Sequence, residues 1–309
     1  MGRIAAVKND LHIERYHENV GFFGLFESER DEATARALFD VAGAWLAARG
    51  LDTMRGPASF SLNEECGLLV DGFDGPPKVM MPYNPPWYQQ LVERYGFVKA
   101  KDLLAYFVAD AKPSERMIRL ADKLRERYRI TVRTLDTKRF WDEVAIVREV
   151  YNEAWQENWG HLPMTDAELT YMAKQLKPVV DPSLVVFAEI DGKIAGFGLA
   201  LPDLNVALKR MNGRLFPVGL VKALWYSREI DTARVLILGV LEKYRRSGVA
   251  ELLELELLRN GPARGITNAE FSWILEDNWM MRGPLEKLGA NVYRTYRMYD
   301  VSTASGRDA

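Results

Sequence analysis

The stretch that decides the fold is RVLILGVLEKYRRSGVAELLELELL, residues 234–258. It begins as an apolar, strand-like run, passes through the hexapeptide Arg245-Arg246-Ser247-Gly248-Val249-Ala250, and ends in a leucine-rich helical run. A glycine-containing turn that opens a helix presents free backbone N–H groups at the positive end of the helix dipole. The stretch therefore predicts a strand, an anion-binding loop and a helix, although many short glycine loops only turn the chain.

Periodicity and capping signals place the elements around this stretch. A Thr165-x-x-Glu168 capping box begins one helix, and Asp191-Gly192 between two apolar runs predicts a β-hairpin. The other expected elements are a connector helix within 114–128, a helix over 140–155, strands over 131–133, 234–240 and 268–275, a short helix closing at 289 and a last strand through 298.

Composition describes a globular protein long enough for two domains, with 309 residues, 48% hydrophobic and 27% charged. Because 41 basic side chains face 43 acidic ones, we expect no nucleic-acid partner. The single Cys66 and three histidines give too few ligands for a structural zinc site, so we expect no metal and a cytoplasmic location. No apolar stretch approaches the roughly 18 residues that span a bilayer.

The chain repeats itself at an offset of 215 positions. GFFGLFES (21–28) falls on LILGVLEK (236–243), the tripeptide Ala-Arg-Gly recurs, and Asn63 falls on Asn278. After a gap of 22 residues, KDLLAYFV meets YRTYRMYD. Agreement of this kind predicts two copies of one unit. The first copy starts at what is the third strand of the second, so either it is shortened or its reading frame begins upstream.

The two copies differ where the anion would bind. The first copy has Arg30-Asp31-Glu32-Ala33-Thr34-Ala35 in place of the glycine-containing hexapeptide. Its two carboxylates would repel an anion from the start of the helix. We therefore expect the first copy to be scaffold and the second to hold the ligand.

The order of these features resembles the GCN5-related N-acetyltransferase (GNAT) superfamily. Arg-x-x-Gly-x-Ala entered from a strand is similar to its coenzyme A pyrophosphate loop, and Leu288-Gly289-Ala290 follows in its order. The resemblance implies an α/β (α+β) fold of two GNAT-like units, each a mixed, mostly antiparallel, twisted sheet with a splayed central parallel strand pair flanked by helices. The implied divisions are a degenerate, N-terminally incomplete domain (1–110), a helical connector (111–129), an acyl-CoA-binding catalytic domain (130–301) and a flexible tail (302–309).

The resemblance also implies which residues hold the coenzyme. Backbone groups of Leu238 and Val240, on either side of Gly239, would bind the pantetheine arm, and Asn278 would line the same cleft. N–H groups of the loop would bind the pyrophosphate, with added positive charge from the two arginines. The loop residues implied are Arg245, Arg246, Ser247, Gly248, Val249 and Ala250.

Catalytic and acceptor residues are less clearly marked. Leu285 occupies the place where many superfamily members carry an acidic tyrosine, so the sequence leaves open Glu276 as acid or base, or proton transfer through water. On the acceptor side, the candidates for an amine-binding wall are Trp155, Glu157, Asn158 and Trp159. The equal alternative is that the two tryptophans fill the core.

The sequence thus predicts an N-acyltransferase that uses acetyl-CoA or another acyl-CoA, with direct attack by a small-molecule or peptide amine in a ternary complex. The alternative is a non-catalytic acyl-CoA-binding sensing or interaction protein, which Leu285 favours. Two further segments are longer than ordinary connections. The first, residues 67–83, is expected to be a long loop that covers the cleft of the neighbouring domain. The basic and aromatic segment 205–227 is expected to form a lid or domain contact rather than to dock on a membrane. A homodimer remains open.

Overall fold

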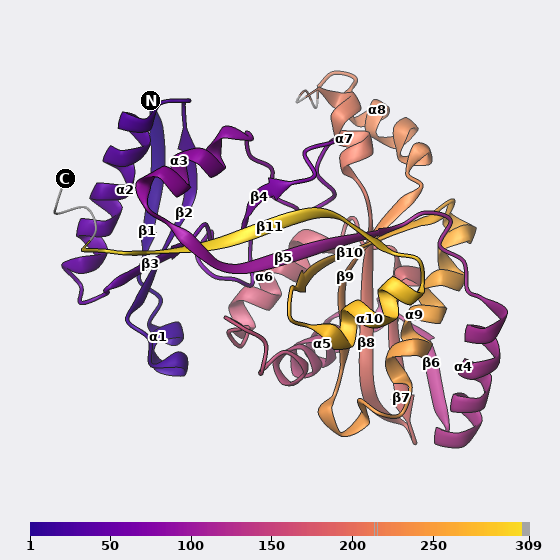
Figure 1. Cartoon of the computed structure of the whole chain (residues 1–309). Helices are drawn as coiled ribbons and strands as arrows, with labels where there is room; N and C mark the ends of the chain where they lie inside the picture. The colour runs from indigo at the N-terminus through magenta and orange to yellow at the C-terminus, as the bar shows by residue number, and fades with distance from the viewer. Residues whose placement is uncertain (213, 215, 305–309) are drawn as a thin grey trace.

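The structure is a computed structural model that describes residues 1–212, 214 and 216–304 (Figure 1). Its strands are β1 (Gly2–Val7), β2 (Val20–Ser28), β3 (Thr53–Gly56), β4 (Leu68–Asp71), β5 (Val98–Val108), β6 (Ile130–Thr134), β7 (Val185–Ile190), β8 (Lys193–Pro202), β9 (Thr232–Val240), β10 (Asn268–Leu275) and β11 (Asn291–Ser302). Its helices are α1 (Asp10–Tyr16), α2 (Glu32–Ala47), α3 (Trp87–Tyr95), α4 (Glu115–Tyr128), α5 (Phe140–Ala154), α6 (Asp166–Leu176), α7 (Asn205–Met211), α8 (Gly219–Tyr226), α9 (Val249–Asn260) and α10 (Trp279–Lys287).

Within the described residues, all the strands join in one mixed sheet. The order is β1-β2-β3-β11-β5-β10-β9-β8-β7-β6, with β4 beside β11. The pairs β2/β3 and β9/β10 are parallel, and the other pairs are antiparallel. Two parallel pairs, one in each half of the chain, confirm the predicted fold of two similar, mostly antiparallel units.

The last strand of each half lies in the sheet of the other half. Residues 103–108 of β5 pair with β10, and residues 299–302 of β11 pair with β3. The two long strands also pair with each other, from Asn291 opposite Phe107 to Asp300 opposite Val98, and cross the middle of Figure 1 side by side. The sequence boundaries 1–110 and 130–301 remain a prediction, but in space each half is completed by a strand from the other.

Local signals explain where the helices begin. In α6 the Thr165 hydroxyl accepts a hydrogen bond from Glu168 N at 3.2 Å, and the Glu168 carboxylate accepts one from Thr165 N at 2.8 Å. These are the two bonds of a capping box, as predicted. The expected connector helix forms as α4, which is capped by Ser114 and packs on α9.

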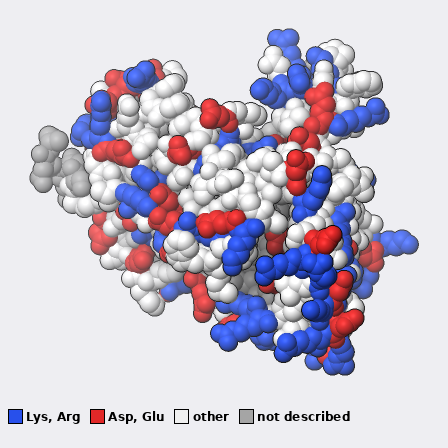
Figure 2. All heavy atoms as spheres, turned by 45° about the vertical axis from the view of Figure 1, so that its right-hand side comes forward, with Lys and Arg blue, Asp and Glu red and all other residues white. Residues whose placement is uncertain are grey.

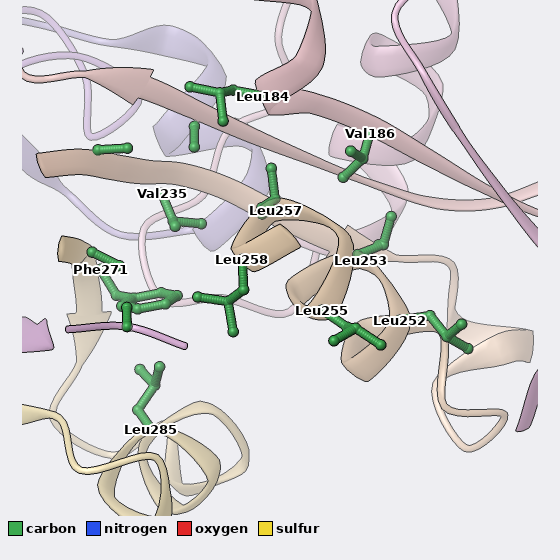
Figure 3. Close-up of a cluster of buried hydrophobic side chains, with 14 of the residues drawn as sticks. Leu184, Val186, Val235, Leu252, Leu253, Leu255, Leu257, Leu258, Phe271 and Leu285 are labelled. Carbon is green, nitrogen blue, oxygen red and sulfur yellow. The ribbon is translucent and has the colours of Figure 1, made fainter. Parts of the chain in front are cut away.

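The core of the second half lies between α9 and the sheet. Leucines of α9 point at β7, β9, β10 and α10, where they meet side chains such as Val186, Val235, Phe271 and Leu285 (Figure 3). Each fully buried leucine stabilises the fold by about 1.5–3 kcal/mol. This packing fixes α9, and therefore the loop that precedes it, against the centre of the sheet.

Candidate functional site

The parallel strands β9 and β10 separate halfway along their length. They pair from Thr232 and Asn268 to Val235 and Phe271. Beyond that point β9 continues to Val240 along β8, whereas the end of β10 runs along β5. The predicted splay is therefore present, and it leaves one flank of residues 236–240 without a neighbouring strand among the described residues.

The hexapeptide forms the start of α9. Gly248 is the residue before the first helical turn, with φ 85°, a left-handed conformation that glycine adopts without strain. The amide of Ser247 donates to the Tyr244 carbonyl at 3.0 Å. Within the described part of the chain, the amides of Gly248, Val249 and Ala250 donate to no protein acceptor. Unused amides at a helix N-terminus are suited to bind a phosphate.

The same position in the first half is already occupied by the protein's own carboxylate. Asp31 caps α2, and its Oδ2 accepts hydrogen bonds from Thr34 N at 2.8 Å and Thr34 Oγ1 at 2.7 Å. These bonds hold the pKa of Asp31 below its usual range. A bound phosphate would have to displace this carboxylate, so the first helix start is a poor anion site.

The loop is held from one side by the connector helix. A Cβ atom at Gly248 would lie 2.4 Å from Cδ1 of Leu124 in α4, so neither the backbone angle nor the space suits a larger residue. Arg245 donates to the Ala154 carbonyl at 3.2 Å and lies 3.7 Å from the Glu157 carboxylate, which joins the loop to the end of α5. Arg246 is exposed. Its contact with a phosphate stays a prediction.

The predicted acceptor residues lie between the two halves. Trp155 stacks on Tyr151 with ring centroids 5.0 Å apart, and it packs so closely on Gly239 that a Cβ there would lie 2.3 Å from the indole. Trp159 lies under the cations of Arg55 and Lys101, at 5.1 and 5.8 Å. Both side chains are half-buried and pack against the edges of core clusters, so contact of either with an amine stays a prediction.

The two polar members of this set have different surroundings. Glu157 is exposed and pairs with Arg245. The Asn158 carbonyl accepts a hydrogen bond from the Tyr16 hydroxyl at 3.3 Å. Because Tyr16 belongs to α1, this bond joins the acceptor segment to the first half. Contact of Glu157 or Asn158 with an amine stays a prediction.

Glu276 and Asn278 have partners within the protein. Glu276 accepts hydrogen bonds from Lys99 Nζ at 2.6 Å and from Asp102 N at 3.1 Å. Asn278 caps α10 through its side-chain oxygen, which accepts a bond from Met281 N at 3.3 Å. Both side chains thus hold β10 and α10 in place. A direct role of Glu276 in proton transfer remains a prediction. Its hydrogen bonds also give Glu276 a structural role, because they join the end of β10 to β5.

A buried polar cluster that sequence reasoning missed lies where β9 and β10 separate. Arg234 Nε donates to Ser272 Oγ at 2.9 Å and lies 3.6 Å from the Glu270 carboxylate. Glu270 also accepts hydrogen bonds from Ser272 Oγ at 3.1 Å and from the Tyr293 hydroxyl at 3.3 Å. Burial raises the pKa of Glu270, although the Arg234 charge opposes this. In the sequence of β10, the polar residues Glu270 and Ser272 alternate with apolar ones, and this alternation could have indicated that both polar side chains lie on one face of the strand.

The segment 67–83 packs on this cluster through its last residues, and its covering of the neighbouring cleft stays a prediction. The carbonyls of Val79 and Met80 accept hydrogen bonds from Arg234 Nη1 at 2.8 and 2.9 Å. Next to the cluster, Trp273 Nε1 is buried and has no hydrogen-bond acceptor among the described residues. A buried indole N–H without an acceptor is costly, and it marks a place where a ligand oxygen could bind.

Cys66 and His161 do not form a nucleophile and base. Burial raises the pKa of the Cys66 thiol to about 12 and lowers the pKa of His161 to about 4. The thiol is therefore protonated at neutral pH and unsuited to attack. Among the described residues, no group of three or more His, Cys, Asp or Glu side chains converges to hold a metal ion. No described helix is both long and apolar enough to cross a bilayer.

A small apolar cavity lies on the α9 face of the sheet. Its volume is about 30 Å³, and Val235, Leu257 and Glu254 contribute to its wall. The space fits a water molecule and is too small for a coenzyme arm. Burial raises the pKa of Glu254 to about 7, because the carboxylate faces this apolar surface.

Sequence comparison places this geometry in a known family. The model of the Acetyltransferase (GNAT) family matches residues 144–289. The chain is 40% identical over 308 residues to Protein YghO of Escherichia coli (strain K12), and the matched region covers 97% of this chain and 78% of Protein YghO. It is 36% identical over 307 residues to a bacterial ceramide synthase of Caulobacter vibrioides (strain NA1000 / CB15N), covering 97% and 80%. The chain therefore belongs to the GNAT acetyltransferase family.

Solved structures show the same fold over nearly the whole chain. A GCN5-related N-acetyltransferase from Sphaerobacter thermophilus superposes with a TM-score of 0.55 at 15% identity, over 98% of this chain and 76% of that one. A tandem GNAT protein from the clavulanic acid biosynthesis pathway superposes with a TM-score of 0.50 at 14% identity, over 93% and 76%. The second similarity supports the interpretation of the chain as a tandem of two units.

Proposed function

We propose that this chain is an acyl-CoA-dependent N-acyltransferase whose second half holds the coenzyme. The observation that carries the proposal is the run of amides at Gly248, Val249 and Ala250, which have no acceptor in the described part of the chain and follow a strand that has separated from its parallel neighbour. The amides would bind the pyrophosphate, and the free flank of Leu236–Val240 would bind the pantetheine arm. Arg246 adds a positive charge beside them.

In the proposed reaction a neutral amine attacks the thioester carbonyl. The new C–N bond forms, the C–S bond breaks, and the proton lost by the amine must reach the departing thiolate. A thioester is already activated, so orientation of the two reactants supplies most of the rate. Residues at the splay would bind the carbonyl and carry the proton.

We propose Glu270 as the group that receives this proton. It lies at the point of strand separation, is bonded to Ser272 and has a raised pKa, as a general base that works near neutral pH requires. Trp273 Nε1, which has no acceptor among the residues that the structure describes, would donate to the thioester oxygen as negative charge develops on that oxygen. Glu276 is the second candidate for the proton, from its place at the end of β10.

The acceptor is an amine, and the relatives suggest where to begin the search. A relative 36% identical is a bacterial ceramide synthase. A long-chain lipid amine therefore joins small-molecule and peptide amines as a candidate acceptor for this chain. For the same reason, a long-chain acyl-CoA becomes a candidate donor beside acetyl-CoA, within the range of acyl-CoA donors that the sequence predicts.

The coenzyme site is tested by calorimetric titration with acetyl-CoA and with a long-chain acyl-CoA. Arg246→Glu should weaken binding about ten- to a hundredfold, because it removes one charge-assisted contact and adds repulsion. Arg30→Glu changes an exposed arginine at the helix start of the first half and is the matched control, for which we expect no change. If both variants bound equally well, the second helix start would not be the phosphate site.

Turnover is tested by release of free thiol from acyl-CoA with a panel of amines. Background from the protein should be low because its single cysteine, Cys66, is buried. Glu270→Gln should lower kcat at least a hundredfold while the affinity for acyl-CoA stays the same, and Trp273→Phe should lower it about tenfold. Tight binding without turnover on any amine would instead favour the non-catalytic binding protein.

A further inference from the structure

The segment between β8 and β9 exposes an unusual amount of apolar side chain. It folds as α7, α8 and a short turn (Ser227–Glu229), and it projects from the body of the molecule (Figure 1). Phe216 is 81% exposed, Val221 and Leu224 are each 67% exposed, and Trp225 is 65% exposed. Leu208 and Val218 are also more than half exposed. In α8, Val221, Leu224 and Trp225 are three and four residues apart, so they lie on one face of the helix.

The same segment is basic between its two ends. Residues 203–231 hold five basic side chains and three acidic ones, and the acidic ones, Asp203, Glu229 and Asp231, lie at the ends of the segment, whereas the whole chain has 41 basic and 43 acidic residues. Figure 2 shows Lys and Arg spread over this projecting lobe, with acidic side chains toward its base. The five cations are Lys209, Arg210, Arg214, Lys222 and Arg228. The lobe therefore carries a local positive charge, although the chain as a whole has a net charge of -2.

Cations and aromatic rings alternate on this lobe. Arg228 lies over the ring of Trp225 at 5.4 Å, and Arg210 lies over the ring of Tyr226 at 5.1 Å. Glu229, at the base, is the acidic partner of Arg210, at 3.4 Å. No ion pair to an acidic group is present for Lys209 or Lys222 within the described residues, so their charges are available to a partner.

The base of the lobe is anchored to the body. The Asp203 carboxylate accepts a hydrogen bond from Val79 N at 2.9 Å and lies 3.2 Å from Lys78 Nζ. Asn205 Nδ2 donates to the Pro77 carbonyl at 2.9 Å. These bonds use polar groups at the base and leave the apolar face of α8 uncovered. A lid would bury that face on its own protein, which this arrangement does not do.

We propose that the α7–α8 lobe docks on an anionic lipid bilayer surface. Exposed Trp, Phe and aliphatic side chains would enter the interface between headgroups and acyl chains, and the surrounding Lys and Arg would pair with lipid phosphates. The combination favours a bilayer over an acidic protein, because exposed apolar side chains and cations occur together on one lobe. This docking does not depend on the proposed chemistry. It replaces the expectation from the sequence, in which residues 205–227 form a lid or domain contact rather than dock on a membrane.

The experiment measures sedimentation of the full chain with vesicles. One set is phosphatidylcholine alone, and the other contains about one-third phosphatidylglycerol. We expect binding to the anionic set that weakens as salt is raised. Each cation near an anionic surface contributes roughly a fivefold increase in partitioning, so Lys209→Gln, Arg214→Gln and Lys222→Gln together should lower it about a hundredfold.

The matched control removes three exposed cations from α4 in place of the lobe. Arg116→Gln, Lys123→Gln and Arg127→Gln should leave vesicle binding within about twofold of the unmodified chain. Phe216→Ser with Trp225→Ser should also abolish binding, and far-UV circular dichroism confirms that each variant is folded. If the unmodified chain did not bind anionic vesicles, or if the two charge variants lost binding equally, the proposal would be overturned. A dimer broken by the Phe216 and Trp225 changes, without vesicle binding, would assign the lobe to a second copy.

Discussion

Gly248→Ala probes how the loop before α9 is built. The residue has φ 85°, and a Cβ there would lie 2.4 Å from Leu124 Cδ1. A left-handed backbone costs a residue with a Cβ about 1–2 kcal/mol, and overpacking costs about 1–3 kcal/mol. We expect the substitution to lower the free energy of unfolding by about 3 kcal/mol.

Two further variants separate these contributions. Gly265 has φ 77°, and no described atom beyond its immediate neighbours lies within 4 Å of a Cβ built on it. Gly265→Ala should therefore cost only the backbone contribution of about 1–2 kcal/mol. In the double variant Gly248→Ala with Leu124→Ala, the clash is removed, so the loss should be smaller than the sum of the two single losses by about 1–2 kcal/mol.

The assay is urea unfolding followed by far-UV circular dichroism, with the slope compared between variants. Equal losses for Gly248→Ala and Gly265→Ala would refute the contact between α4 and the loop. Simple additivity in the double variant would refute it as well. Either result would mean that α4 does not hold the helix start in the described position.

Three other predictions follow from particular groups. Folding raises the pKa of Glu254 to about 7, so the burial of this carboxyl group lowers the free energy of unfolding progressively as pH rises from about 4.5 to 7. Glu254→Gln should therefore stabilise the protein at pH 8 by up to about 3 kcal/mol and have little effect near pH 4. Urea unfolding at both pH values would measure the two differences. Glu276→Gln weakens a partly exposed ion pair with Lys99, so it should lower the free energy of unfolding by about 1 kcal/mol or less. If the variant lost turnover but kept its stability, Glu276 would be the residue that transfers the proton. A chain of residues 130–309 alone lacks β5, so it should show no cooperative unfolding transition, whereas a cooperative one would show that β10 does not need this neighbour.

Much of the second half could be predicted because its signals are local. The capping box at Thr165, the Asp191-Gly192 turn and the strand over 268–275 depend on residues close together in sequence, and all three are present. The loop before α9 was also marked by a local signal, since one glycine in a short turn gives α9 its start. The splay of β9 and β10 followed from the family resemblance and is confirmed.

The exchange of β5 and β11 could not be predicted in the same way. Both strands are long, and nothing in either sequence selects one parallel pair over the other, so strand order depends on contacts almost 200 residues apart. The cluster of Arg234 and Glu270 could not be predicted for a related reason. The partner of a charged residue inside an apolar strand is known only once the pairing of the strands is known. The exposure of Trp225 was equally hidden, since a helix of apolar residues usually packs inward.

The exchanged strands also bear on the history of the duplicated chain. A duplicate that has lost its own ligand site is normally free to accumulate changes or to be deleted. Here the first half provides β5, which lies between β10 and β11 of the second half. If the proposed acyl transfer takes place in the second half, selection for it would preserve the fold of the first half and would allow the surface of that half to diverge while its final strand is maintained.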